Sequence, residues 1–361
     1  MQTGIRIEQL KLSDKHQLLA FLREAYAENP RMSDERFWDW HFLENPYVAP
    51  DDLPVWLAWS GQRIAGQLAA TPVRLQIGAE RKPTMWILDL IVHDDFRRRG
   101  IAKQLVRKAE EFCAIGLGIN TVEQHSTAVL ESLGWLVPCK IPRYNKLLFA
   151  GNMLPEIARI APLRRTLNLL SAPFRPRADQ ALFQAGGKLR MLDKFDAAFD
   201  ELWNEASANW PCAVARESCL LDWQFVRQPG KKFDIIGYYT GDKLLGYAVV
   251  FVRKPNKSGQ VAKASIADLC YHPDGAEETV DELLRAALDV AVTRGAGTLV
   301  TDVLDGLIER RLKRIGFRPV KNPLQFLVKS TGADEKLLQD ARSWFLTRGD
   351  SDISIFEHPN L

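Results

Sequence analysis

The sequence predicts an α/β (α+β) protein built from two similar units in tandem, each a mixed, mostly antiparallel sheet flanked by helices. Three observations lead to this prediction. The length of 361 residues corresponds to two domains of ordinary size, motifs of the first half return in the second half, and strand-like segments alternate with helical ones. With 46% hydrophobic and 26% charged residues, the composition is that of a globular protein rather than a disordered one.

Five short motifs recur in the same order at nearly constant spacing. Asp-Trp-His-Phe at 39–42 returns as Asp-Trp-Gln-Phe at 222–225, GQRIAG at 61–66 as GDKLLG at 241–246, ILDLIVH at 87–93 as IADLCYH at 266–272, Leu-Gly-Trp at 133–135 as Ile-Gly-Phe at 315–317, and Pro142 as Pro323. Self-similarity of this kind predicts a tandem duplication. Residues found in both copies are interpreted as structural: Trp40 and Trp223, His93 and His272, Asp89 and Asp268.

Hydrophobic spacing gives the elements of the first copy in order. Period-two alternation or buried apolar runs predict strands over 5–10, 53–60, 63–70, 86–92 and 119–122, and helical spacing predicts helices over 14–27, 101–115 and 127–133. Asp14 stands where a helix N-cap is expected, and Gly61-Gln62 separates two strands like a hairpin turn. We expect a first domain over 1–150, a second over 188–330, and a C-terminal helix and tail over 331–361, with the helix at 334–345.

The segment 151–187 is predicted to be a linker that forms a helix. Its apolar and basic residues over 155–177 would suit a helix packed on either domain, or one lying on a membrane surface, and we expect packing. No segment reaches the roughly 20 apolar residues of a membrane span, and the N-terminal segment does not resemble a signal peptide. Five scattered cysteines then favour a cytoplasmic protein with reduced thiols.

The net charge and the spacing of cysteines and acidic residues argue against a nucleic-acid partner and against a bound metal ion. The net charge of +3, from 48 basic and 45 acidic residues, gives no overall support for nucleic-acid binding. The cysteines form no CxxC pair, and Asp350 with Asp352 in a tail does not make a metal site. We therefore expect neither a nucleic-acid partner nor a metal.

The segment from Val92 to Ala102 joins a predicted strand directly to a predicted helix. Such a junction points several unpaired backbone N–H groups at one place, with the positive end of the helix dipole behind them. Gly100 and the small Ala102 let an anion approach the backbone, and three arginines, 97–99, add positive charge. The segment therefore predicts a phosphate-binding loop.

This loop resembles the pyrophosphate loop of the GNAT (GCN5-related N-acetyltransferase) family, which has Arg or Gln, two residues, Gly, one residue, and Gly or Ala. Arg97, Gly100 and Ala102 match that pattern, and Leu-Gly-Trp at 133–135 resembles the family's later Leu-Gly-Phe. The resemblance covers about residues 5–150. It implies that acetyl-CoA is the co-substrate, held along the strand by Leu90, Ile91 and Val92 and at the loop by Arg97, Arg98, Arg99, Gly100, Ile101 and Ala102.

The second copy lacks the loop when the two copies are aligned at constant spacing. Ala276 then stands for Arg97, and Thr279 and Asp281 stand for the glycine and alanine of the loop. Acidic side chains around these positions would repel a pyrophosphate. The chain thus resembles tandem GNAT proteins in which the second copy is degenerate, and we expect one acetyl-CoA per chain.

The catalytic residues depart from the family's pattern. The position of the family's general-acid tyrosine is Leu130, and that of its asparagine is Glu123. Since strands four and five of the family's fold separate around the acetyl group, the resemblance implies Glu123 as the base, with His125 or Tyr144 assisting the thiolate. The alternative is that Glu123 caps the following helix and His125 is a surface residue.

We therefore expect an acetyl-CoA-dependent N-acyltransferase that acts on an amine of a small molecule, sugar or peptide. One alternative is a CoA-binding sensor or scaffold without turnover, which the missing tyrosine permits. Another is a peptidoglycan-type aminoacyltransferase using aminoacyl-tRNA, which the near-neutral charge and the complete loop disfavour.

Overall fold

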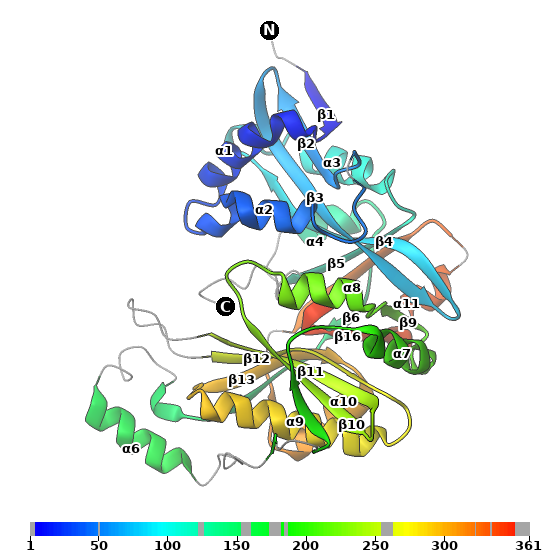
Figure 1. The fold of residues 1–361 in the computed structure, drawn as a ribbon. Coiled ribbons are helices and arrows are strands. Elements are labelled where there is room, and N and C mark those ends of the chain that lie inside the picture. Colours follow the sequence, from blue (N-terminus) through cyan, green and yellow to red (C-terminus); the bar gives the residue numbers. More distant parts are fainter. Residues whose placement is uncertain are drawn as a thin grey trace.

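The structure is a computed structural model that describes residues 4–49, 51–121, 126–152, 160–172, 182–183, 187–253, 263–321, 323–332 and 334–350. Figure 1 shows two bodies of sheet and helix, with most of the first half of the chain in the upper body and most of the second half in the lower one. The predicted fold class is confirmed, because both sheets are mixed and mostly antiparallel and are flanked by helices.

The first half follows the predicted order of elements. They are β1 (Ile5–Gln9), α1 (Lys15–Ala25), α2 (Glu35–Phe42), β2 (Val55–Ser60), β3 (Arg63–Ile77), β4 (Glu80–Val92), α3 (Ile101–Glu110), β5 (Ile115–Thr121), α4 (Ser126–Glu131) and β6 (Leu136–Ile141). Antiparallel pairing joins β1 to β2, β2 to β3 and β3 to β4, and parallel pairing joins β4 to β5. Gly61 turns the β2–β3 hairpin with a φ of 62°, a conformation that glycine adopts without steric cost.

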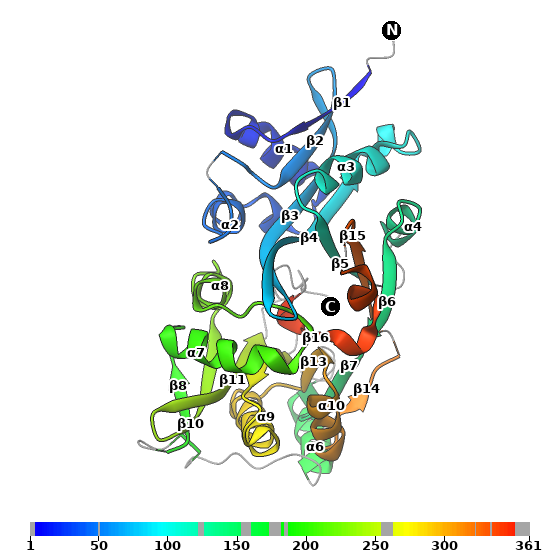
Figure 2. The same cartoon turned by 90° about the vertical axis from the view of Figure 1, so that its right-hand side faces the viewer.

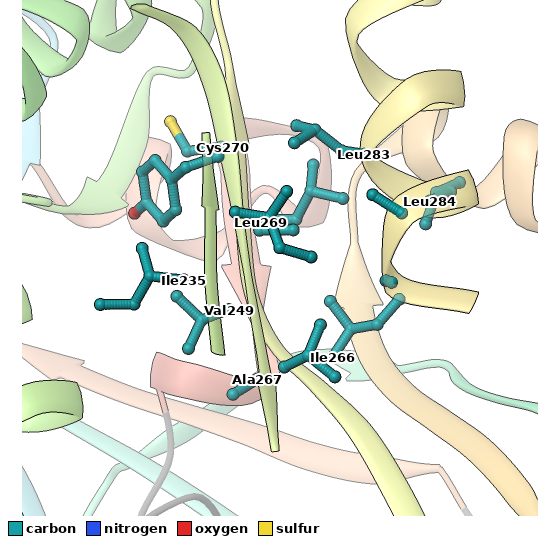
Figure 3. Packing of buried hydrophobic residues seen from close by; sticks show 14 of the residues in the cluster. Ile235, Val249, Ile266, Ala267, Leu269, Cys270, Leu283 and Leu284 are labelled. Atoms are coloured by element: carbon teal, nitrogen blue, oxygen red, sulfur yellow. The ribbon is translucent and has the colours of Figure 1, made fainter. Parts of the chain in front are cut away.

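The second half has the same succession of elements. They are β8 (Leu189–Leu192), α7 (Ala197–Ala206), α8 (Ser218–Leu221), β10 (Phe233–Thr240), β11 (Lys243–Arg253), β12 (Lys263–Tyr271), α9 (Ala276–Thr293), β13 (Thr298–Leu304), α10 (Gly306–Arg314) and β14 (Arg318–Pro319). Gly241 turns the β10–β11 hairpin, again with a φ of 62°. Figure 3 shows the core between this sheet and α9, where Ile266 and Leu269 lie on the side of the sheet that faces Leu283 and Leu284.

Each sheet is completed by a strand from the other half of the chain. β7 (Arg143–Leu147) pairs with β13 and β14, and β15 (Leu324–Ser330) lies between β5 and β6, as Figure 2 shows. The first sheet is therefore β1-β2-β3-β4-β5-β15-β6 and the second is β8-β10-β11-β12-β13-β7-β14. Each of the ranges 1–150 and 188–330 thus contains one strand that belongs to the sheet of the other range.

Two short strands also bridge the sheets. β9 (Cys212–Val214) pairs with the end of β3, and β16 (Trp344–Thr347) pairs with both β9 and β13. The helix predicted at 334–345 is only partly present, as α11 (Glu335–Gln339), because the chain then turns and enters β16. The sixteen strands consequently form one continuous hydrogen-bonded assembly.

Two tryptophans link the halves reciprocally. Trp40 Nε1 donates to the carbonyl oxygen of Trp223 at 2.9 Å, and Trp223 Nε1 donates to that of Trp40 at 2.8 Å. Their rings stack at 4.8 Å between centroids and 12° between planes. Because both indoles are almost fully buried, the interpretation of the repeated Asp-Trp-x-Phe elements as packing anchors is confirmed.

The predicted linker contains helix α6 (Ala161–Ser171). Asn168 Oδ1 accepts a hydrogen bond from the N–H of Gly151 and so ties the helix to the end of the preceding segment. Leu169 and Leu170 are 73% and 68% exposed, so one side of the helix is not packed on either sheet. Among the described residues, no helix is long and apolar enough to cross a membrane.

Candidate active site

Strand β4 carries a bulge where its pairing with β3 changes register. Gln67 pairs with Ile91, and Ala69 pairs with Leu88. β4 therefore has one residue more than β3 over this interval. Within the bulge, Asp89 has a φ of 51°, a left-handed conformation that costs a non-glycine residue about 1 kcal/mol or more. The surrounding structure must hold it in place.

β4 and β5 separate next to this bulge. They pair at only two positions, Met85 with Gly116 and Trp86 with Leu117, although β4 runs on to residue 92 and β5 to residue 121. We call this opening between β4 and β5 the first splay. The predicted pantetheine residues 90–92 lie on β4 along the first splay and are half-buried, so the edge of β4 is available to pair with a bound molecule.

The loop after β4 presents a row of backbone N–H groups. Arg98 and Gly100 have φ values of 63° and 74°, and Gly100 is the N-cap of α3. Within the described residues, the N–H groups of residues 98–103 find no hydrogen-bond acceptor; the first such bond of the helix is donated by Gln104 to Gly100 O. Nothing lies within 4 Å of the place where a Cβ on Gly100 would stand. These features fit a diphosphate.

The arginines of the loop are exposed, and two of them are tied locally. Arg97 Nη2 lies 2.7 Å from Asp94 Oδ1, and Arg99 Nη2 donates to the carbonyl oxygen of Asp95 at 3.0 Å. Arg98 has no ion pair with any residue that the structure describes. Since exposed ion pairs are weak, the backbone N–H groups, rather than one arginine, define the anion site.

Comparison with known proteins places this part of the chain in a known kind of domain. The sequence model of the acetyltransferase (GNAT) family matches residues 17–135, a range that includes β4, the loop and α3. Residues 17–135 thus match a GNAT family domain. No curated protein sequence matches the chain significantly.

Solved structures with the GNAT fold resemble the chain over nearly its whole length. Saccharomyces cerevisiae N-myristoyltransferase with bound myristoyl-CoA aligns with a TM-score of 0.62 and 12% identity, over 91% of this chain and 83% of that one. A probable N-acyltransferase from Enterococcus faecalis V583 gives 0.61 and 13%, over 91% and 73%. A GCN5-related N-acetyltransferase from Anabaena variabilis gives 0.61 and 13%, over 93% and 75%. At these identities the likeness establishes the fold.

The structure describes only one of the three predicted catalytic residues, Tyr144. Glu123 and His125 lie outside the described residues, just beyond β5. Tyr144 lies on β7 and so belongs to the second sheet, where its hydroxyl donates to Glu309 Oε2 at 2.6 Å. Burial, and this bond to Glu309, raise the pKa of Tyr144 well above its usual value. The strand exchange therefore places Tyr144 away from the first splay.

Leu130, at the position of the family's tyrosine, is buried in α4 and packs in the apolar cluster beneath α3. Sequence reasoning missed Tyr26, whose hydroxyl lies 3.4 Å from Asp89 Oδ1 at the bulge. It also missed Gln325, which comes from β15 and accepts from Thr127 Oγ1 at 3.4 Å. No signal in the sequence placed Gln325 here, because β15 is contributed by the other half of the chain.

The loop of the second half is not the one that constant spacing predicted. Helix α9 begins at Ala276, with Gly275 as its N-cap at a φ of 66°. Gly275 therefore occupies the place of Gly100, and Thr279 does not; Thr279 is fully buried inside the helix. Gly275 follows His272 by three positions and Gly100 follows His93 by seven, so this loop is shorter by four residues.

The first turn of α9 is acidic, whereas that of α3 has no acid. Glu278 accepts from Tyr238 Oη at 2.6 Å and from Lys188 Nζ at 2.8 Å, and Glu277 pairs with Arg311. Carboxylates at a helix N-terminus stabilise the helix and repel another anion. The second loop therefore lacks the acid-free helix N-terminus of the first loop.

A C-terminal segment fills the opening between β12 and β13, which corresponds to the first splay. The last pair between β12 and β13 is Ser265 with Val300. Further along β13, Val303 pairs with β16 instead. Thr347 Oγ1 donates to Asp268 Oδ1 at 2.8 Å, across the opening. Among the described residues, no group of His, Cys, Asp and Glu is placed to hold a metal ion in either half.

Proposed function

We propose that the first half of the chain transfers an acyl group from acyl-CoA to an amine, with acetyl-CoA as the donor to test first. The observation that carries this proposal is the row of backbone N–H groups at 98–103, which follows a strand whose edge is open toward β5. Acyl-CoA has a diphosphate for the first feature and an amide-bearing arm for the second. The GNAT family and fold support acyl transfer in general.

In this reaction the amine nitrogen attacks the thioester carbon, the C–S bond breaks, and the CoA thiolate takes up a proton. An alkylammonium must first lose a proton, so a base has to lie within about 3 Å of it or reach it through a water. We propose Glu123 as that base and His125 as the group assisting the thiolate, because both follow β5 closely in the sequence and β5 is one of the two strands that border the first splay. Tyr144 has no part in this proposal, since Glu309 holds its hydroxyl in the second sheet.

We further propose that the second half is a degenerate copy of the first. The common order of elements and the matching hairpin glycines support a duplicated unit. The shortened loop, the acidic first turn of α9 and the filled opening beside β12 support the loss of acyl-CoA binding in this copy. One acyl-CoA per chain follows.

Release of free thiol tests the proposal. The full chain is incubated with acetyl-CoA and a panel of primary amines of small molecules, sugars and peptides, and then with longer donors up to myristoyl-CoA, since the N-myristoyltransferase structure holds that ligand. We expect amine-dependent thiol release with at least one donor. Binding of acyl-CoA without thiol release from any pair would contradict acyl transfer and support a CoA-binding sensor instead.

A further inference from the structure

A hollow lies between the two halves, on one face of β4. It encloses about 500 Å³ of space free of atoms, including open solvent at its mouth. The first half contributes Thr71, Val73, Trp86 and Leu88; the second contributes residues 214–216, 220, 221, 223 and 224, Asp268, Gly349 and Asp350. We call this space the interunit hollow.

One wall of the interunit hollow is the strand that borders the first splay. Trp86 belongs to the last paired position between β4 and β5. Leu88 directly precedes Asp89, the left-handed residue of the bulge. A molecule in the hollow would therefore reach β4 where the two strands begin to separate.

The interunit hollow has apolar walls and a charged end. Trp86, Leu88, Val73 and Trp223 supply apolar surface suited to an aliphatic body. The charged end holds one guanidinium and two carboxylates: Arg216, Asp268 and Asp350, all buried. Among the described residues these are the only ionisable groups that line it, so with both carboxylates ionised its lining carries one negative charge in excess.

One oxygen at the charged end accepts no hydrogen bond from the described part of the chain. Asp350, which is 8% exposed, uses Oδ2 to accept from Arg216 Nη2 at 2.6 Å and from the N–H of Thr347 at 2.7 Å. No residue that the structure describes donates to its Oδ1. Asp268 differs, because Thr347 Oγ1 donates to its Oδ1 at 2.8 Å and Tyr247 Oη to its Oδ2 at 2.7 Å.

Burial raises the pKa of Asp350; Arg216 opposes this change and Asp268 adds to it, and the net direction is upward. Burial therefore disfavours the charged form of Asp350 even with Arg216 beside it. A buried charge without compensation is costly, and a second cation at this end would remove that cost.

We propose, on the basis of the proposed function, that the interunit hollow is the acceptor site and that the acceptor is an aliphatic diamine. Its reacting amine lies toward the first splay, its methylene chain lies between the apolar walls, and its second ammonium donates to Asp350 Oδ1. An ammonium carries three donors and one positive charge, which the free oxygen and the excess negative charge match. An acyl chain in this place would instead press its methyl end against buried charges, which disfavours it.

The transfer consumes one thioester and one ammonium. The reacting nitrogen loses a proton to the base, forms the amide bond as the C–S bond breaks, and loses its second proton as the CoA thiolate becomes a thiol. The second ammonium at Asp350 keeps its protons throughout, so the product is a monoacylated diamine with one positive charge.

A comparison of diamines with monoamines tests the inference. The full chain receives a saturating acyl-CoA donor and a series from 1,3-diaminopropane to 1,8-diaminooctane, each matched with the 1-aminoalkane of equal length. We expect kcat/KM for the best diamine to exceed that of its matched monoamine by about tenfold to a hundredfold, the range for a hydrogen bond to a charged group. Asp350→Asn should bring this ratio to about one.

The comparison within the wild-type chain needs no variant, so a folding defect in Asp350→Asn would not remove the test. Equal kcat/KM for diamines and monoamines would overturn the diamine site and leave acyl transfer standing. Absence of acyl transfer to every amine, with every donor, would overturn the proposed function and this inference with it. A diamine preference that survives intact in folded Asp350→Asn would also contradict the role given to Asp350.

Discussion

The connections that follow β4 and β12 begin alike and end differently. In each, a histidine Nδ1 accepts from the N–H two residues later, in His93 at 3.2 Å and in His272 at 3.0 Å. In each, a left-handed glycine caps the next helix. Between these points the first loop has four more residues, including three arginines, and its helix starts without acids. The two connections thus differ in the insert and in the first turn of the helix, although the fold around them is the same.

The openings beside β4 and β12 also differ, because only the one beside β12 is filled by another segment of the chain. Beyond Trp86, β4 pairs with no further residue of β5 in the described part of the chain. Beside β12, the corresponding space is occupied by β16 and the turn Arg348–Asp350. Asp89 is half-buried and near Tyr26; its counterpart Asp268 is buried in a network with Arg216. The two aspartates match in sequence but lie in different surroundings: Asp89 is partly open to solvent, and Asp268 is part of a buried ionic network.

The largest expected effect is the loss of acyl-CoA binding in Gly100→Glu. A carboxylate there would face the diphosphate, and juxtaposed like charges cost several kcal/mol, so we expect affinity to fall at least about a hundredfold in calorimetry. Gly275→Glu is the matched control, because Gly275 is also left-handed and also has nothing within 4 Å of its Cβ position. Similar losses in both variants would contradict the difference between the loops.

Glu123→Gln should lower kcat by about a hundredfold, the lower end for loss of a general base, with acyl-CoA affinity unchanged. Steady-state rates at saturating amine across a pH series measure this effect. Full turnover in the variant at every pH would rule out Glu123 as the base.

A smaller effect concerns the stability of the chain at low pH. The two halves differ at one position of the repeated Asp-Trp-x-Phe motif, which is His41 in the first half and Gln224 in the second. His41 is buried, with Nε2 at 2.7 Å from Thr71 Oγ1. Burial, aided by the charge of Arg31, lowers the pKa of His41 to about 3. The unfolded chain therefore binds a proton that the folded chain excludes. The contribution of neutral His41 to the free energy of unfolding is therefore complete above about pH 6.5 and declines as the pH falls toward 3.

At pH 5 this contribution of His41 amounts to a loss of about 2 kcal/mol relative to pH 7. Denaturant unfolding at both pH values should show a smaller difference in His41→Gln than in the wild-type chain. Identical differences in the two proteins would show that His41 is not the group responsible.

The sequence anticipated the features that depend on local pattern. The order of strands and helices follows hydrophobic spacing, and the loop at 97–102 can be recognised because its glycine and arginines are contiguous. The reciprocal contacts of Trp40 and Trp223 agree with their interpretation as repeated packing anchors.

Features that depend on distant pairing could not be anticipated. Strands were not predicted at β7 and β15, and hydrophobic spacing could not have shown which sheet each joins, so Tyr144 was predicted near the first splay. Constant spacing concealed the four residues missing before α9, because a change of length inside a loop leaves the flanking motifs recognisable. The segment that fills the opening beside β12 has no counterpart in the first half, and its tendency toward helix was overridden by pairing with β13.

One chain should bind one acyl-CoA, in its first half. Isothermal titration of the full chain with acetyl-CoA measures this, because it gives stoichiometry independently of any acceptor. We expect a single site per chain. Two equivalent sites per chain would contradict it, since they would require a diphosphate at the acidic first turn of α9 and an open edge beside β12.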